Sequence, residues 1–205
     1  MTLLSLGDSY TIGEQVAEHE NFPNQLVKVL ERRGINFSAP RIIAKTGWTT
    51  DELSDAIATQ NIHEKFDYVT LLIGVNNQYR GRDVEEYARE FDSLLQQAIS
   101  FAGKASHHVI VISIPDWSVT PFAALPRDNG DMNDLNKIAR EIDSYNETNR
   151  SISEQQGVHY LYITDGTREA INDSSLLAAD GLHPSAKEYQ RWANRLADII
   201  QKAGS

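Results

Sequence analysis

The chain has 205 residues, of which 40% are hydrophobic and 23% are charged, a composition typical of one globular domain and unlike that of a disordered or membrane-resident segment. Its formal net charge of -10 at pH 7 disfavours contact with a phosphate backbone, so we expect no binding to nucleic acid. The absence of cysteine excludes disulfides, a thiolate nucleophile and any zinc site built on sulfur.

The first residues form a short apolar stretch without the basic side chains of a signal peptide, and no apolar run reaches membrane-spanning length. We therefore expect a cytoplasmic protein with no integral membrane contact, or a secreted one if a leader has been removed.

Short apolar runs rich in β-branched residues alternate with stretches of helical periodicity, which is typical of βαβ units and a parallel sheet. The predicted strands are 2–6, 38–43, 68–73, 109–114 and 159–163. The third and fourth are apolar almost throughout, which indicates strands covered on both faces. We expect a single α/β domain over residues 1–205, with three layers around a five-stranded parallel sheet.

Five helices are predicted between and after these strands. The first begins near Pro23 and ends at Gly34, and the second begins with Thr49 and Glu52, which have the spacing of a capping box. Apolar residues at three- and four-residue spacing predict three further helices, at 84–99, 134–156 and 185–202.

The longest stretch without periodicity is 115–133, which carries the apolar residues Trp117, Phe122 and Leu125. Loops of this length are often functional, so we expect this segment to form a pocket wall.

The tripeptide Gly7-Asp8-Ser9 follows the first predicted strand directly. In an open α/β sheet the carboxyl end of a strand is where ligands bind, so Ser9 is a candidate nucleophile. Taken alone, the tripeptide is more typical of an ordinary turn.

Near the other terminus, the segment 180–184 reads DGLHP and puts Asp180 three residues before His183. A turn there can bring the carboxylate onto one ring nitrogen and leave the other free to accept a proton. The alternative is a helix cap beside a surface histidine, and the pair becomes informative only together with Ser9.

Four sequence blocks, in this order, are similar to those of the SGNH (GDSL-like) hydrolases, whose signature residues are Ser, Gly, Asn and His. The blocks are 6–11 (LGDSYT), 44–50 (AKTGWTT), 74–77 (GVNN) and 180–184 (DGLHP). Each follows a predicted strand, so the four converge on one rim of the sheet. Asn77 stands where the family usually has an acidic residue, which removes a charge from that rim.

The resemblance implies a flavodoxin-like strand order of 2-1-3-4-5 and a serine esterase that needs no cofactor and no metal. It assigns Ser9 as nucleophile, His183 as general base and Asp180 as the residue that orients the imidazole. It assigns the oxyanion hole to the backbone amides of Ser9 and Gly47 and to the side-chain amide of Asn76. The expected substrates are carboxylic esters or thioesters, and the family is associated with lipid, aryl and acetylated sugar esters.

Candidate substrate-binding residues flank these blocks or lie in the long loop. They are Asp8, Tyr10, Trp48, Trp117 and Phe122. Arg80 and Arg82 follow the Asn block and are interpreted as solvated loop arginines, with binding of an acidic substrate group as the alternative.

Two other functions remain open on the sequence. In the first, the protein is a flavodoxin-like binding module in which the segment 9–13 cradles a phosphate. In the second, it is a non-catalytic SGNH-like carrier. Neither a Walker loop nor the dinucleotide glycine pattern is present, and the first alternative leaves Asp180 and His183 without a role.

Overall fold

The computed structural model describes residues 1–126 and 130–203, and its framework is a sheet of parallel strands. The strands are β1 (Leu3–Gly7), β2 (Arg41–Ala44), β3 (Tyr68–Leu72), β4 (Val109–Ile112) and β5 (His159–Leu161). Their order is β2-β1-β3-β4-β5, which confirms the predicted topology.

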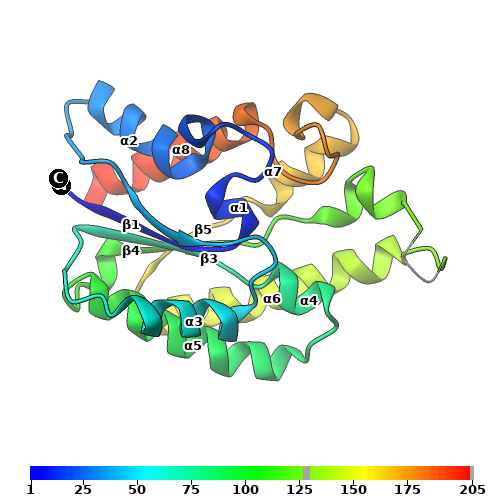
Figure 1. Cartoon of the computed structure of the whole chain (residues 1–205), viewed down its shortest axis with the longest axis horizontal. Coiled ribbons are helices and arrows are strands. Elements are labelled where there is room, and N and C mark those ends of the chain that lie inside the picture. The colour runs from blue at the N-terminus through cyan, green and yellow to red at the C-terminus, as the bar shows by residue number, and fades with distance from the viewer. Residues whose placement is uncertain (127–129, 204–205) are drawn as a thin grey trace.

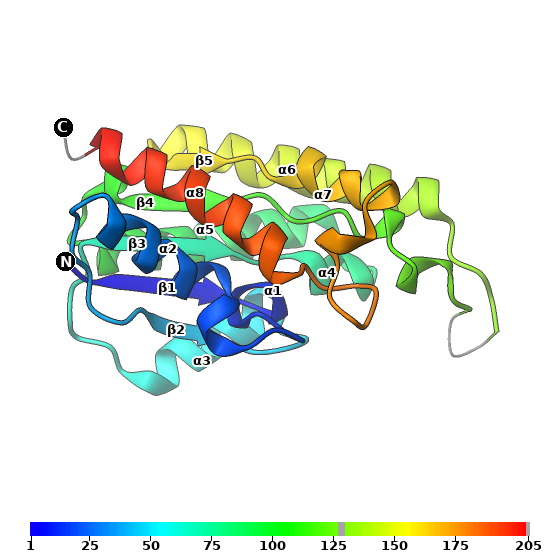
Figure 2. The same cartoon turned by 90° about the horizontal axis from the view of Figure 1, so that it is seen from above.

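Helices cover both faces of this sheet, which confirms the three-layer prediction (Figure 1). One layer contains α1 (Ser9–Ile12), α2 (Phe22–Arg32), α7 (Thr164–Arg168) and α8 (Ala186–Ala203). The other contains α3 (Thr50–Gln60), α4 (Val75–Tyr79), α5 (Val84–Phe101) and α6 (Leu135–Gln156). Figure 2 shows α2 and α8 side by side over the strands, where their apolar faces close one half of the core.

The burial of the strands follows their place in the sheet. Every residue of β1, β3 and β4 is buried, whereas the edge strands β2 and β5 are partly exposed. Strands three and four are therefore central, as their unbroken apolar runs predicted.

The predicted strand limits were wrong by a few residues, mostly at the carboxyl ends. The predictions 109–114 and 159–163 run past the end of β4 and β5, because apolar burial continues after strand pairing stops. Ile114 and Ile163 are fully buried, yet Ser113 Oγ accepts the backbone N–H of Ile163 at 2.8 Å in place of a strand partner. The first prediction, 2–6, and the second, 38–43, begin before β1 and β2 do.

The five long helices begin and end close to their predicted limits. On α8 the predicted inward residues Tyr189, Trp192 and Leu196 are buried. Ile199 is only partly buried, because the apolar face continues at four-residue spacing to Ile200, which is 2% exposed.

Three short helices, α1, α4 and α7, were not predicted, and the first two matter most for the site. With 4 residues in α1 and 5 in α4, neither is long enough to show an amphipathic period. They follow β1 and β3 directly and place Ser9 and Asn76 at the carboxyl end of the sheet. Short 3-10 helices occur at Glu18–Glu20, Ser106–His108, Trp117–Val119, Phe122–Ala124, Glu169–Ile171 and Ser174–Leu176.

Candidate active site

Ser9 is the first residue of α1 and lies just beyond β1. Asp8 caps this helix, because its Oδ1 accepts the backbone N–H of Tyr10 at 3.0 Å. Gly7 leaves room for the turn, since a Cβ on it would lie 2.1 Å from Thr11 Oγ1. The turn presents the Ser9 hydroxyl at the start of a helix, together with a backbone N–H that intrahelical bonding leaves free.

His183 reaches Ser9 from the other end of the chain. Its Nε2 lies 3.0 Å from Ser9 Oγ, and its Nδ1 lies 2.6 Å from Asp180 Oδ2. The other oxygen of Asp180 accepts the backbone N–H groups of Leu182 and His183, both at 3.0 Å. One carboxylate thus shapes the turn and also orients the ring, so that Nδ1–H donates to Asp180 and Nε2 faces Ser9 as an acceptor.

The charge of Asp180 suits this arrangement. Partial burial acts to raise the pKa of its carboxyl group, but hydrogen bonds from the His183 ring and from the Leu182 and His183 amides outweigh it. The pKa of Asp180 therefore lies below its ordinary value, and the group is a carboxylate at neutral pH.

Gly47, in the segment after β2, and Asn76, on α4, line the same cavity as Ser9 and His183. The Asn76 amide donates from Nδ2 to the carbonyl oxygen of Trp48 at 2.9 Å. This bond uses one of the two amide hydrogens and leaves the second for another acceptor. Gly47 has a φ of 85°, in the left-handed region that favours glycine.

Arg80 is exposed and Arg82 is partly exposed, in keeping with their interpretation as solvated arginines, but both are also held by specific acceptors. Arg80 Nη2 donates to the carbonyl oxygen of Gly47 at 2.7 Å, and its Nη1 donates to Glu52 Oε1 at 3.2 Å. Arg82 donates to both carboxylate oxygens of Asp51, at 2.7 and 3.2 Å. Sequence reasoning missed these contacts because the segments that carry the two arginines and their acceptors meet only in the folded chain.

Asn77 has a structural place beside these residues. Its Oδ1 accepts the backbone N–H of Thr50 at 3.1 Å, and its Nδ2 donates to Thr50 Oγ1 at 2.6 Å. Asn77 is fully buried, so a neutral amide satisfies the first turn of α3 where an acidic residue would bring a buried charge.

A cavity of about 210 Å³ opens above Ser9. Its lining residues are Ser9, Tyr10, Thr46, Gly47, Val75, Asn76, Tyr79, Trp117, Phe122, Leu182 and His183. The polar residues of this lining are Ser9, Thr46, Asn76 and His183, and most of the other side chains are aromatic or aliphatic. Such a cavity suits a small organic molecule with one polar reacting centre.

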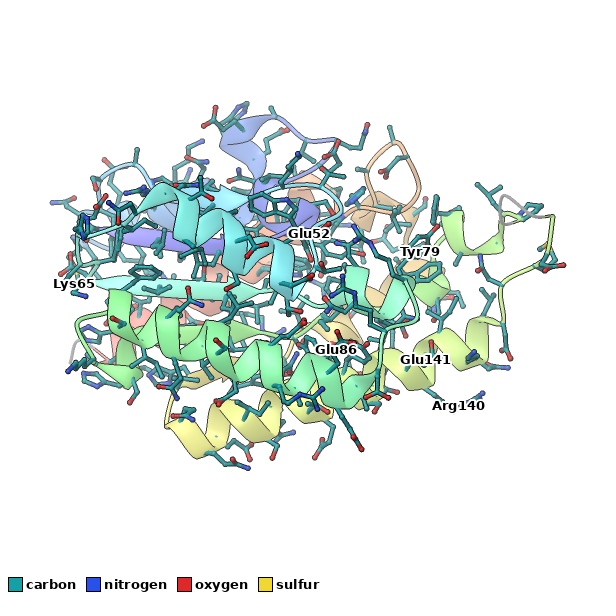
Figure 3. All side chains as sticks on the ribbon, turned by 60° about the horizontal axis from the view of Figure 1, so that its bottom comes forward. Glu52, Lys65, Tyr79, Glu86, Arg140 and Glu141 are labelled. Carbon is teal, nitrogen blue, oxygen red and sulfur yellow. The ribbon has the colours of Figure 1, made fainter. Side chains whose placement is uncertain are left out.

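The aromatic part of this wall is held by defined contacts. Trp117 Nε1 donates to Gln78 Oε1 at 2.8 Å, and the rings of Tyr79 and Trp117 meet edge to face with centroids 5.5 Å apart. The backbone N–H of Phe122 donates to Gly181 O at 3.1 Å, which joins the wall to the turn that carries His183. In Figure 3 Tyr79 lies at the outside of α4, in agreement with its exposed fraction of 58%.

Among the predicted substrate-binding residues, Tyr10, Trp117 and Phe122 line the cavity, whereas Asp8 and Trp48 do not. Asp8 is buried beneath the turn that carries Ser9, and Trp48 is partly buried against the core, so contact of these two with substrate stays a prediction that the cavity wall does not support. Adjacency in sequence to a site residue does not decide the direction of a side chain.

Four lining residues were not predicted: Thr46, Val75, Tyr79 and Leu182. Tyr79 lies three residues after Asn76, a spacing that puts both on one helical face, so a prediction of α4 would have found it. Leu125, which was expected in the wall, is 57% exposed.

Burial changes the pKa of the Asp8 carboxyl group. Its loss of solvent raises its pKa to about 7, although the backbone N–H of Tyr10 acts to lower it. Asp8 Oδ2 has no hydrogen-bond partner among the described residues.

The geometry disfavours a phosphate-cradling loop at 9–13. The segment begins as helix α1, and Thr11 is fully buried, so its hydroxyl is not available to a bound phosphate. In residues 1–126 and 130–203, no three His, Asp or Glu side chains are grouped so as to hold a metal ion. No helix in these ranges combines the length and the hydropathy needed to cross a bilayer.

Comparison with protein families matches residues 5–191 to the GDSL-like Lipase/Acylhydrolase family. No match was found among curated proteins. Among solved structures the chain is similar to TesA, with a TM-score of 0.74 and 19% identity over 99% of both chains.

Two further solved structures share the fold at similarly low identity. The psychrotrophic esterase EstA from Pseudoalteromonas sp. has a TM-score of 0.68 and 19% identity, over 98% of this chain and 97% of that one. Axe2, an acetylxylan esterase from Geobacillus stearothermophilus, has a TM-score of 0.70 and 18% identity, over 97% of this chain and 93% of that one. Because the family match spans most of the sequence, the protein belongs to the GDSL-like lipase/acylhydrolase family and is an ester hydrolase of the SGNH type.

Proposed function

We propose that the protein hydrolyses carboxylic esters through an acyl-enzyme on Ser9. The observation that carries this proposal is the continuous contact from Asp180 to His183 to Ser9, with separations of 2.6 and 3.0 Å. The contact joins a hydroxyl, an imidazole and a carboxylate in the order that nucleophilic catalysis by serine requires.

In the first half of the reaction, Ser9 Oγ attacks the ester carbonyl carbon and its proton passes to His183 Nε2. The tetrahedral adduct collapses, the bond to the alcohol oxygen breaks, and His183 gives its proton to that oxygen. In the second half, water attacks the acyl-enzyme with His183 as base, and Ser9 leaves with the returned proton. Asp180 stabilises the imidazolium that forms twice in each cycle.

The negative oxygen of both adducts needs hydrogen-bond donors. We assign the backbone N–H groups of Ser9 and Gly47 and the second amide hydrogen of Asn76 to this task. Two features support the assignment. Ser9 begins a helix, where its N–H has no intrahelical acceptor, and the Asn76 amide is held by Trp48 in a fixed orientation.

The cavity wall indicates which ester component the protein accepts. Val75, Trp117, Phe122 and Leu182 present apolar surface beside Ser9, so we propose that an apolar acyl or aryl group packs there. The acetylxylan esterase Axe2 shares the fold, and an acetylated sugar is the competing substrate class. An ester panel that runs from acetyl to decanoyl, with acetylated xylose added, separates the two.

The proposal is tested with wild type, Ser9→Ala and His183→Ala on this panel. We expect hydrolysis by wild type only, with the optimum at an acyl group longer than acetyl. Hydrolysis that persists in Ser9→Ala would reject the nucleophile, and activity confined to acetylated xylose would reject the apolar substrate class.

A fluorophosphonate probe tests the nucleophile independently of the substrate. Attack by Ser9 Oγ on phosphorus displaces fluoride and leaves a stable phosphonylated serine, visible as a mass increase on the peptide that contains Ser9. EstA, which shares the fold, has been described as inhibited by monoethylphosphonate. Folded wild type that stays unlabelled would favour the non-catalytic carrier over the esterase.

A further inference from the structure

The two donors assigned outside the serine turn lie on segments far apart in sequence. Gly47 belongs to the segment after β2, and Asn76 belongs to α4. Stabilisation of an oxyanion depends on donors fixed before the reaction, and a misplacement of about 1 Å can cost on the order of 100-fold in rate. The protein therefore needs contacts that hold the Gly47 peptide relative to α4.

Sterics alone do not provide this constraint. A Cβ placed on Gly47 would meet only Arg80 Nη2, at 3.9 Å, so the glycine lies in open space on that side. A glycine with a φ of 85° also has the widest conformational freedom of any residue. Its orientation must come from hydrogen bonds to the neighbouring peptide groups.

One of these bonds is local, because the backbone N–H of Trp48 donates to Lys45 O at 3.2 Å. Two further bonds tie the segment to α4 or its C-cap, and their acceptors are successive carbonyl groups. Trp48 O accepts from Asn76 Nδ2 at 2.9 Å, and Gly47 O accepts from Arg80 Nη2 at 2.7 Å. Asn76 is itself an assigned donor, so its bond to Trp48 links the two halves of the oxyanion hole. Arg80 touches no assigned donor atom, yet it holds the residue that carries one.

Arg80 is in turn held by α3. Its Nη1 donates to Glu52 Oε1 at 3.2 Å, while Glu52 Oε2 accepts the backbone N–H of Thr49 at 2.9 Å. Glu52 and Tyr79, the last residue of α4, are both labelled in Figure 3, which shows how the start of α3 approaches this helix. The contacts close a ring that runs from Gly47 through Thr49, Glu52 and Arg80 back to Gly47.

We infer that Arg80, held by Glu52, is a positioning residue: it fixes the Gly47 carbonyl, which restricts the φ and ψ of Gly47 and so aims the Gly47 N–H at the oxyanion. The inference rests on the proposed ester hydrolysis. A guanidinium is suited to the task, because its planar fork donates to a carbonyl and a carboxylate at once. The single ammonium of lysine cannot reproduce this geometry.

Arg82 provides a matched control. It also pairs with an acidic residue in the first turn of α3, through two bonds to Asp51, and its side chain is likewise partly exposed. It lies two residues beyond Arg80, and the hydrogen bonds of its side chain go to Asp51 and not to Gly47. Removal of either arginine breaks an ion pair to α3, and only the loss of Arg80 frees the glycine peptide.

The test compares Arg80→Ala, Arg80→Lys and Arg82→Ala with wild type on the best ester of the panel. We expect Arg80→Ala to lose roughly 10- to 100-fold in kcat with KM near wild type, because the lost interaction acts in the transition state. Added guanidinium should restore part of this kcat, and Arg80→Lys should remain impaired. Arg82→Ala should keep the wild-type kcat.

Hydrogen exchange of the backbone amides in 45–49 gives a readout that does not depend on activity. We expect faster exchange in Arg80→Ala than in Arg82→Ala. If wild type cleaves no ester, the proposed function fails, and the exchange comparison still decides whether Arg80 holds the Gly47 segment. Equal exchange in the two alanine variants, or equal kcat without a response to guanidinium, would overturn the inference.

Discussion

Histidines lie at both ends of the sheet, and the groups that contact their rings differ between the two ends. At the carboxyl end, His183 contacts a carboxylate through one nitrogen and a serine hydroxyl through the other. At the amino end, the rings of His107 and His108 meet edge to face with centroids 4.4 Å apart, and His159 Nε2 is buried without a hydrogen-bond partner among the described residues. A cluster of imidazoles is therefore not a site in itself, and the orientation of one ring between two partners is what permits proton transfer.

The largest expected loss of kcat is seen when an alanine substitution at His183 is compared with one at His159. His183→Ala should reduce kcat by roughly 10⁴- to 10⁶-fold, because the general base is lost. His159→Ala should leave kcat at the wild-type value. Steady-state ester hydrolysis by the two purified variants measures this, and comparable losses in both would remove the distinction between the two ends.

The orienting carboxylate is the next most sensitive position. Asp180→Asn keeps the shape of the turn and removes the charge that stabilises the imidazolium, so kcat should fall by roughly 10³- to 10⁴-fold. The rate of Asp180→Asn should rise again at high pH, because hydroxide then replaces the impaired base. A pH–rate profile of Asp180→Asn that parallels wild type, with kcat intact, would show that Asp180 only shapes the turn.

A substitution at Asn76 tests the proposed stabilisation of the oxyanion. Asn76→Ala removes one donor to the oxyanion, and kcat should fall by roughly 10²- to 10³-fold while KM changes little. Phosphonylation of Ser9 should slow in parallel, because its transition state also develops a negative oxygen. The control is Asn172→Ala, on a residue that lies outside the cavity and should keep the wild-type rates.

Asp8 lies beneath Ser9 and is expected to influence stability more than chemistry. Burial raises the pKa of Asp8 from 3.8 to about 7, so between these values the folded protein keeps a proton that the unfolded chain has released. The free energy of unfolding should therefore fall as the pH rises through this window. Asp8→Asn cannot ionise, and its stability relative to wild type should grow by on the order of 1–4 kcal/mol between pH 4 and pH 8.

Urea denaturation of both proteins at several pH values measures this difference. A constant gap in the free energy of unfolding across the range would mean that Asp8 titrates normally in the fold.

The contribution of His159 to the pH dependence of stability is expected to have the opposite sign to that of Asp8. It is also the smallest of the expected effects. Burial and the neighbouring His107 lower its pKa below 6.5, so the unfolded chain binds the proton more tightly than the folded one does. The contribution of His159 to stability is present above pH 6.5 and is lost as the pH falls through the lowered pKa. In His159→Gln the decline of Tm below pH 6.5 should become shallower, and an unchanged decline would assign it to other groups.

The sequence predicted the architecture well because its signals are local and repeated. The apolar runs of β3 and β4 and the period of α5 each extend over enough residues to be read without neighbours. The short helices α1 and α4 escaped prediction, since a single turn has no period to detect. The sequence also could not give the direction of the Asp8 side chain: one residue beside a nucleophile can point into a cavity or under a turn, and the surrounding packing decides which.

By itself, the sequence determined the layers, the strand order implied by the family blocks, and which few residues carry the chemical groups for acyl transfer. The tertiary structure alone decided that the Ser9 hydroxyl meets an imidazole 174 positions away, that Asn76 and Arg80 donate to the carbonyl oxygens of Trp48 and Gly47, and that Tyr79 and Leu182 line the cavity. The reason is physical. Residue types and local periods are properties of neighbouring positions, whereas a hydrogen bond between distant segments exists only after the core has packed and brought their backbones within reach.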